Sequence, residues 1–201
     1  MIIQQTDITG ILPHAKLADI QKYLPFLQKY MPLYGIDTPQ RAGAFIAQIG
    51  EESINLSAVR EDISDADAEK EYGVPTQAAK NLGNVNPGDG AHFKGHGLIQ
   101  ITGRAMTLGC STALFKDHRL LNTPEVLEQP EWAVASACWF WKDVKGLNFI
   151  CDQPEQWTKF SQHFNKTYTK IEWITILING GLNGIAVRTA NYTAARQVLK
   201  F

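Results

Sequence analysis

The sequence predicts an all-α protein, one mainly helical domain over residues 1–201 with two lobes and at most a small β element. Three observations predict this class. Apolar residues recur at three- and four-residue steps over most of the chain. Capping residues, prolines and glycines separate these stretches. Only one short segment alternates polar and apolar residues as a strand does, and no internal repeat or flexible linker divides the chain.

The N-terminal third predicts two helices. Residues 17–31 carry apolar side chains at helical spacing, and Pro25 inside this pattern should kink or split the helix. The next helix should begin where Thr38 caps it and Pro39 fits its first turn. The buried face of that helix is one apolar stripe, formed by Ala42, Phe45, Ile46 and Ile49.

Shorter elements follow in the middle of the chain. Capped short helices are predicted over 64–69 and 76–82. Residues 83–90 are rich in turn formers and predict an irregular loop. The one predicted strand is Leu98–Ile101.

The C-terminal half should again be helical. A long helix should open at Thr123, and its tryptophans either stack on a ligand or, more simply, fill the core. A strongly apolar helix over 171–178 should end at Asn179 and the two glycines after it. Residues 185–199 predict a last helix.

Charge and composition exclude several classes of function. A net charge of −1 gives no reason to expect a nucleic-acid partner. No run of about 18 apolar residues occurs, so we expect no membrane insertion. The first residues lack a basic stretch followed by an apolar run, so we expect synthesis in the cytoplasm without a signal peptide.

Nothing in the sequence indicates a metal or a cofactor. The chain has three cysteines at wide spacing, which argues against both a disulfide framework and a zinc site. His92 and His96 are four residues apart but have no acid at a useful spacing. The glycines around His96 do not form a dinucleotide fingerprint.

The candidate catalytic residues are acids at the end of the second long helix. Glu51 and Glu52 close that helix, and Glu61 follows nine residues after Glu52. On one straight helix, nine residues place two side chains half a turn apart, so these acids can share a cleft only if the chain bends. Residues 53–57 favour helix ends and turns, which makes a bend reasonable. Two carboxylates across one cleft are what glycosidic bond cleavage requires, whereas separate acids would be a solvated helix end.

Glu52 is the better candidate of the two adjacent acids. Side chains of neighbouring helical residues point about 100° apart, so only one of Glu51 and Glu52 can face a cleft. Glu52 lies three residues after Ile49, on the apolar stripe, and Glu51 lies off it. A carboxyl group on the buried side of a helix favours its protonated form, which a general acid needs.

Four further residues are candidates for binding. Gln100 and Thr102 would share one face of the predicted strand, either towards a groove or simply towards solvent. Asn179 is either a ligand-binding amide or a plain helix stop. Arg188 is either a surface charge or the partner of a cleft carboxylate. The pattern alone does not choose between these alternatives.

Four stretches in order along the chain carry a resemblance to a known family. They are Arg41–Ser53 (RAGAFIAQIGEES), Val59–Asp62 (VRED), Leu82–Arg104 (LGNVNPGDGAHFKGHGLIQITGR) and Ile178–Gly184 (INGGLNG) followed by Arg188. Together they resemble glycoside hydrolase family 19, and within it the small phage lysozymes, or endolysins, more than the plant chitinases. The similarity spans roughly residues 10–200.

The resemblance implies a lysozyme-like fold and a metal-free, inverting mechanism. Glu52 would be the general acid and Glu61 the general base. Thr102 would help to hold the attacking water, and Gln100 and Asn179 would bind substrate. Arg188 would neutralise cleft carboxylates. The implied substrate is the β-1,4-linked glycan of peptidoglycan.

The resemblance also implies where such an enzyme works. We expect a monomer without a separate wall-binding domain that acts on the periplasmic cell wall. A holin pore or a secretion machine would deliver it there.

Three departures from the family pattern occur, the last of them over two adjacent residues. Glu51 stands where the family has His, which places a second carboxylate beside Glu52 and adds like-charge repulsion. His96 replaces an arginine and so removes a fixed positive charge. Met106 and Thr107 replace Asn-Tyr. These changes bear on substrate preference and on activity level more than on the fold.

Three functions therefore compete at the level of the sequence. The first is a peptidoglycan glycosidase. The second is a chitinase of the same family, which would use the same acids with different cleft walls. The third is a glycan-binding domain without catalytic activity, in which the acids would be dispensable.

Overall fold

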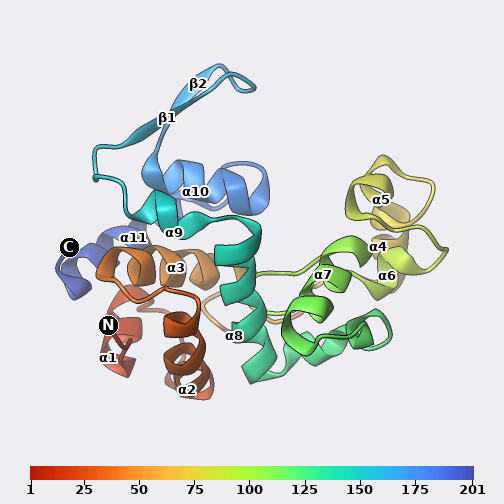
Figure 1. The fold of residues 1–201 in the computed structure, drawn as a ribbon, viewed down its shortest axis with the longest axis horizontal. Helices are drawn as coiled ribbons and strands as arrows, with labels where there is room; N and C mark the ends of the chain where they lie inside the picture. The colour runs from red at the N-terminus through yellow and green to blue at the C-terminus, as the bar shows by residue number, and fades with distance from the viewer.

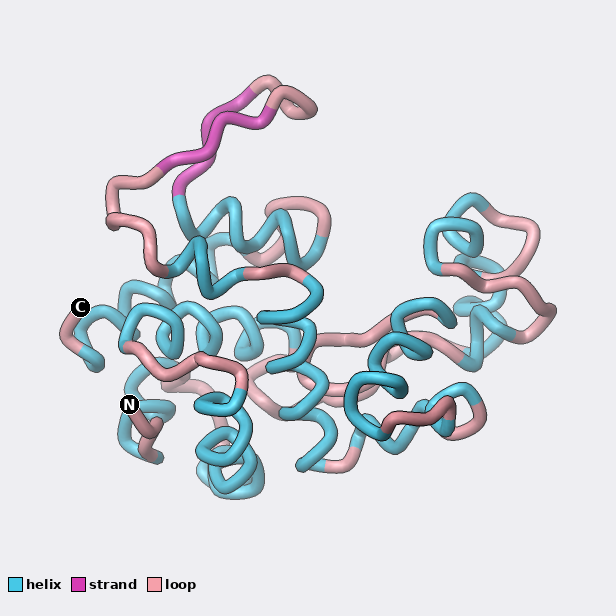
Figure 2. The backbone as a smooth tube through the Cα atoms, viewed as in Figure 1, coloured by secondary structure: helices cyan, strands magenta, loops and turns pink.

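The computed structural model describes all 201 residues and confirms a mainly helical protein with one small sheet (Figures 1 and 2). In chain order the α-helices are α1 (Gln5–Ile11), α2 (Leu17–Leu33), α3 (Pro39–Glu52), α4 (Asp65–Tyr72), α5 (Gln77–Leu82), α6 (Asp89–His92), α7 (Arg104–Phe115), α8 (Pro130–Trp139), α9 (Leu147–Cys151), α10 (Lys170–Asn179) and α11 (Ile185–Leu199). Three short helical turns complete the helical part: η1 (Arg119–Leu121), η2 (Pro124–Glu128) and η3 (Phe140–Val144). Strands β1 (Thr158–Ser161) and β2 (Lys166–Thr169) form an antiparallel hairpin.

Helix α3 is the central element of the larger lobe. It begins as predicted, because the Thr38 side chain accepts a hydrogen bond from the Arg41 amide and Pro39 occupies the first turn. Every residue from 42 to 50 is buried. Helix α11 packs closely against it, since a side chain in place of Gly43 would lie 2.9 Å from Ala195. The core that holds α3 therefore also fixes the position of its last residue, Glu52.

Two sequence predictions about helices were wrong in part. Helix α2 is not split at Pro25, because one helix runs from Leu17 to Leu33 through both of its prolines. Burial of the core-facing side chains stabilises this helix by more than the loss of a backbone hydrogen bond at proline destabilises it. The helix predicted from Thr123 is interrupted, since η2 precedes α8 and Pro130 starts the new helix.

Two of the three tryptophans of this region belong to the core. Trp139 and Trp141 are buried, and Trp141 packs edge-to-face on Phe45 with 5.3 Å between ring centroids. Trp132 is half-buried and stacks on Phe115.

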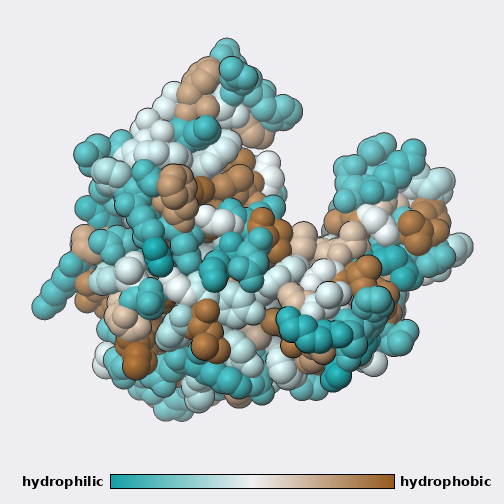
Figure 3. Space-filling model, in the orientation of Figure 1, coloured by the Kyte–Doolittle hydropathy of each residue, from teal (hydrophilic) through white to brown (hydrophobic).

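The smaller lobe contains α4, α5 and α6 and stands apart from the larger one in Figure 1, with a hollow between the two in Figure 3. Ser64 and Thr76 cap α4 and α5 as predicted. The loop after α5 is closed by a bidentate ion pair, in which Arg104 donates to buried Asp89 at 2.6 and 2.8 Å. The Arg104 guanidinium, with the amides of Asn86 and Val85, holds the pKa of Asp89 well below its usual range.

The predicted strand Leu98–Ile101 is wrong. The segment forms a turn in which Gln100 has a left-handed φ of 57°, and only isolated bridges join Arg60 to His96 and His96 to Ile101. The real sheet is the hairpin β1–β2, which projects from the larger lobe beyond α10 (Figure 1). Most side chains of this hairpin are exposed, so its sequence lacks the alternation that marks a half-buried strand.

The C-terminal predictions are confirmed. Helix α10 ends at Asn179 because Gly180 adopts the left-handed conformation, and α11 covers residues 185–199. All three cysteines are buried and free. None of the helices combines the length and the apolar character that a membrane crossing would need.

Candidate active site

The chain reverses direction directly after α3, which is the bend that Glu52 and Glu61 need in order to share one cleft. Ile54, Asn55 and Leu56 have φ angles of 50°, 57° and 67°, and three consecutive left-handed residues turn the backbone away from the helix axis. The hydroxyl of Ser53 accepts a hydrogen bond from the Leu56 amide at 2.9 Å and stabilises this turn. Non-glycine residues with left-handed φ angles carry backbone strain, and such strain concentrates at functional sites.

The reversal brings the two candidate acids to one cavity of about 210 Å³. The residues that line it are Glu52, Ile54, Ala58, Arg60, Glu61, Asp62 and Gln100. The bend predicted from the sequence is therefore confirmed, and the acids do not lie on opposite sides of the molecule.

Glu52 is held from inside the larger lobe. Its carboxylate accepts a hydrogen bond from Nη2 of Arg188 at 2.6 Å, and Arg188 is buried. Nη1 of Arg188 donates to Gln48, whose amide donates in turn to Thr175 at 3.0 Å. The Glu52 side chain is 15% exposed, so one oxygen can be fixed by the protein while the group still faces the cavity.

Glu61 is held by different groups. Its Oε1 accepts from the Tyr72 hydroxyl at 2.7 Å, and its Oε2 accepts from the Gly95 amide at 2.9 Å. Burial, and then the hydrogen bond to Glu61, raises the pKa of Tyr72, so the phenol keeps its proton and remains a donor. Glu61 also donates its own amide to the Gly95 carbonyl, which joins the segment after α3 to the 95–104 turn.

Gln100 and Thr102 are close to the acids but do not share a strand face. Gln100 lines the cavity and donates its side-chain amide to the Gly97 carbonyl at 2.9 Å. The half-buried Thr102 hydroxyl donates to the carbonyl of Gln100 at 3.0 Å. Thr102 thus supports the backbone that carries Gln100, and it does not line this cavity.

Asn179 and Arg188 meet at one carbonyl group. The Asn179 amide donates to the Asn183 carbonyl at 3.1 Å, and Nε of Arg188 donates to the same carbonyl at 3.1 Å. The oxygen of the Asn179 amide accepts from Gly181. Asn179 therefore orders the turn that holds Arg188, and both of its amide atoms are engaged in that turn.

Glu51 points away from the cavity. Its carboxylate packs against Gly184, where it leaves no room for a side chain. The choice of Glu52 as the acid that faces the cavity is confirmed, because Glu52 follows the buried stripe of α3 and Glu51 does not.

His96 occupies the position where the family pattern has an arginine, and it is buried. Its Nδ1 lies 2.9 Å from Oε1 of Glu128. Burial lowers the pKa of His96, against the raising effect of Glu128, so the ring is neutral at pH 7. Backbone bonds from His96 to Ile101 at 3.1 and 2.8 Å fix the turn whose Gly95 amide holds Glu61.

This burial predicts a loss of stability in mild acid. The folded pKa of His96 lies below its unfolded value of about 6.5, so the unfolded chain binds the proton more readily. The stability that the uncharged, buried His96 ring contributes is fully present above pH 6.5 and is lost as the pH falls through the pKa of His96 in the folded protein. Urea unfolding between pH 7.5 and 5 should show a falling free energy of unfolding, with a smaller slope for His96→Gln. Equal slopes for the two proteins would contradict it.

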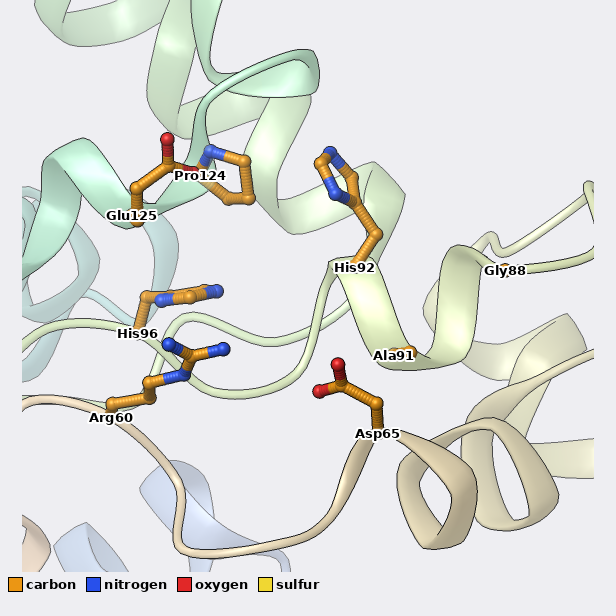
Figure 4. A pocket seen from close by; sticks show the side chains of 8 residues that line it. All are labelled: Arg60, Asp65, Gly88, Ala91, His92, His96, Pro124 and Glu125. Carbon is orange, nitrogen blue, oxygen red and sulfur yellow. The ribbon is translucent and has the colours of Figure 1, made fainter.

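A second, more polar cavity of about 360 Å³ adjoins the first (Figure 4). The residues that line it are Arg60, Asp65, Gly88, Ala91, His92, His96, Pro124 and Glu125. Arg60 lines both cavities, so the two lie on either side of this side chain. No cluster of three or more His, Cys, Asp or Glu side chains suited to a metal ion occurs in the chain.

The sequence reasoning missed three residues that the site uses. Gln48 lies four residues before Glu52, and this helical spacing signals that it shares a face with Glu52. Tyr72 carries no such signal, because only the packing of α4 brings its hydroxyl to Glu61. Arg60 directly precedes Glu61 in the chain, but only its bridge to the 95–104 turn at His96 places it at the cavities.

The helical fold and the two acids in one cavity define a protein of the lysozyme-like glycoside hydrolase class. No family model matches the sequence. The chain is 26% identical over 219 residues to a glycosyl hydrolase family 19 domain-containing protein of Haemophilus influenzae, and the match covers 96% of each protein. This similarity confirms the resemblance to family 19 and extends over nearly the whole length of the chain.

Solved structures show the same fold. Chitinase C from Streptomyces griseus superposes with a TM-score of 0.64 at 20% identity, over 98% of this chain and 76% of that one. A bacterial family 19 chitinase superposes with a TM-score of 0.60 at 19% identity, over 99% of this chain and 95% of that one.

Proposed function

We propose that the protein is a peptidoglycan-degrading glycosidase that cleaves β-1,4 bonds by inverting general acid/base catalysis. One observation carries this proposal: Glu52 and Glu61 line the same cavity although the chain must reverse between them. Carboxylate pairs across a cleft are the groups that glycosidic hydrolysis requires. The relatedness to family 19 supports the same class of reaction.

The different surroundings of the two acids suit different roles. Glu52 comes from the rigid, buried α3 and would give its proton to the glycosidic oxygen as the bond between this oxygen and the anomeric carbon breaks. Glu61 would take a proton from a water molecule whose oxygen bonds to the anomeric carbon from the opposite face. Tyr72 and the Gly95 amide orient Glu61 for this step.

The sugar would lie against the groups between these acids. Gln100 lines the cavity, and Thr102 supports the backbone of Gln100. Arg188 donates a hydrogen bond to one oxygen of the Glu52 carboxyl group and holds this group in place. Asn179 would bind substrate by exchanging its present hydrogen bonds within the turn that holds Arg188 for bonds to the sugar.

Inversion gives a direct test of the reaction. Hydrolysis of a β-linked glycan should release the α-anomer first, because water attacks the face opposite the leaving group. Proton NMR of fresh digests of purified peptidoglycan measures this anomer before mutarotation. Mass spectrometry of the same digest identifies which sugar carries the new reducing end. Release of the β-anomer, or no reducing ends at all, would contradict the proposal.

A chitinase is the second candidate, because both solved structures described above are chitinases. The two functions differ in the preferred polymer and share the acids. A higher kcat/KM for chitin oligomers than for purified peptidoglycan would favour the chitinase.

A further inference from the structure

We propose that the polar cavity beside the acids binds the charged peptide branch of the glycan, through Arg60 and Glu125. The inference rests on the proposed peptidoglycan hydrolase function, and it names the part of the substrate that this second cavity receives. It therefore concerns selectivity between a peptide-bearing and a peptide-free polymer of similar backbone.

The position of the cavity fits a branch. Arg60 lines both the cavity of about 210 Å³ that holds Glu52 and Glu61 and the neighbouring one of about 360 Å³. A sugar bound at the acids would thus have its substituents within reach of the second cavity. Figure 4 shows the guanidinium of Arg60 directed into this space, next to the ring of His96.

Most polar groups of the cavity are already engaged. His92 is hydrogen-bonded to the Leu121 carbonyl at 2.9 Å, His96 is paired with Glu128, and Asp65 accepts from Lys94 at 2.7 Å. These contacts hold the three side chains in place, although Asp65 uses only one carboxylate oxygen and its side chain is 74% exposed.

Arg60 and Glu125 are the exceptions. The nearest carboxylate to Arg60 is Glu128, 3.9 Å from its Nε, and the Arg60 side chain is 53% exposed. Glu125 is exposed, lines the same cavity and has no ion-pair partner. A guanidinium that is not hydrogen-bonded offers a planar fork for a carboxylate, and an unpaired carboxylate accepts from an ammonium group.

The cavity thus presents one guanidinium without a hydrogen bond and one carboxylate without an ion-pair partner, which suits a ligand that carries both charges. The peptide branches of peptidoglycan carry both carboxylate and amino groups, whereas chitin carries neither charge. A site for a simple anion would not include unpaired Glu125, and a site for a neutral sugar would need neither charge. The charges therefore fit a short zwitterionic peptide next to the scissile glycan.

Two substrates with the same glycan separate this inference from the proposed function. One is intact purified peptidoglycan, and the other is the same material after an amidase has removed its peptides and the lactyl carboxylates that this exposes have been blocked as neutral amides. The quantity to measure is the ratio of kcat/KM for intact over stripped glycan. Wild-type protein should show a ratio well above one. Arg60→Gln and Glu125→Gln should each lower this ratio about tenfold, because each variant loses one charge-assisted hydrogen bond to the peptide. If the wild-type ratio is below about ten, each variant should lower it to one.

Arg119→Gln is the matched control, since Arg119 is a surface arginine paired with Asp117 outside both cavities. This variant should keep the wild-type ratio, and Arg60→Lys should retain part of it. Thermal unfolding checks that each variant is folded. A wild-type ratio near one, or ratios unchanged in both cavity variants, would overturn the inference while cleavage itself persists. Failure of wild-type protein to cleave either material would instead refute the proposed function.

Discussion

Glu52→Gln should lower kcat for glycan hydrolysis by about 10³-fold, within the range that general acid catalysis contributes. The amide has the shape of the carboxyl group but has no acidic proton to give to the leaving oxygen. It can still accept the hydrogen bond that Arg188 now donates to Glu52, so the fold should be retained. Release of reducing ends from purified peptidoglycan measures the loss, and the midpoint of thermal unfolding checks the fold.

Glu51→Gln is the neighbouring control for this experiment. The Glu51 side chain packs against Gly184 and does not line the cavity, so replacing its carboxylate by an amide should leave kcat within a few-fold of wild type. Full clearing of cell walls by Glu52→Gln would contradict the role of the acid. Wild-type protein that binds the wall but releases no reducing ends would point to the glycan-binding function without catalysis.

Arg188→Met should destabilise the protein by about 3–5 kcal/mol, the usual cost of breaking a buried ion pair by removing one partner. Arg188 is 3% exposed, and its guanidinium donates to Glu52, Gln48 and the Asn183 carbonyl. Methionine fills a similar volume but leaves the Glu52 and Gln48 oxygens without this donor, whereas the Asn183 carbonyl keeps the Asn179 amide as its donor. Urea unfolding with a constant m-value would measure the change.

A double-mutant cycle isolates the ion pair from the rest of this effect. Arg188→Met combined with Glu52→Gln should recover about 1 kcal/mol or more relative to the sum of the single changes, because no unpaired charge remains buried. Arg196→Gln on the same helix is the control. Arg196 is 45% exposed and its contact to Glu155 is 3.5 Å, so this change should cost under about 1 kcal/mol. An additive cycle would show that Arg188 supports the fold through contacts other than the one with Glu52.

Sequence reasoning succeeded where local chemistry decides. The cap at Thr38, the stop at Gly180 and the apolar stripe of α3 lie within a few residues of the features they predict. The stripe also separated Glu52 from Glu51, because burial along one helix follows its period. The polar residues after Ser53 indicated the reversal that the structure shows.

The failures share a cause in longer-range packing. Leu98–Ile101 alternates as a strand does, but no neighbouring strand pairs along its length, so it forms a turn around Gln100. Pro25 would end an isolated helix, yet the core retains α2 as one element. The hairpin β1–β2 has little buried surface and so left no periodic signal.

By itself the sequence determined several helices, among them α3, α10 and α11, and which acid follows the buried face of α3, whereas α1, α7 and α9 were not predicted. Caps, periodicity and turn residues act over a few positions, so these properties are readable without coordinates. Only the tertiary structure decided which groups meet: Arg188 reaches Glu52 across 136 residues, and Gly95 reaches Glu61 across 34. Such contacts depend on how whole helices pack, and no local pattern in the chain encodes that geometry.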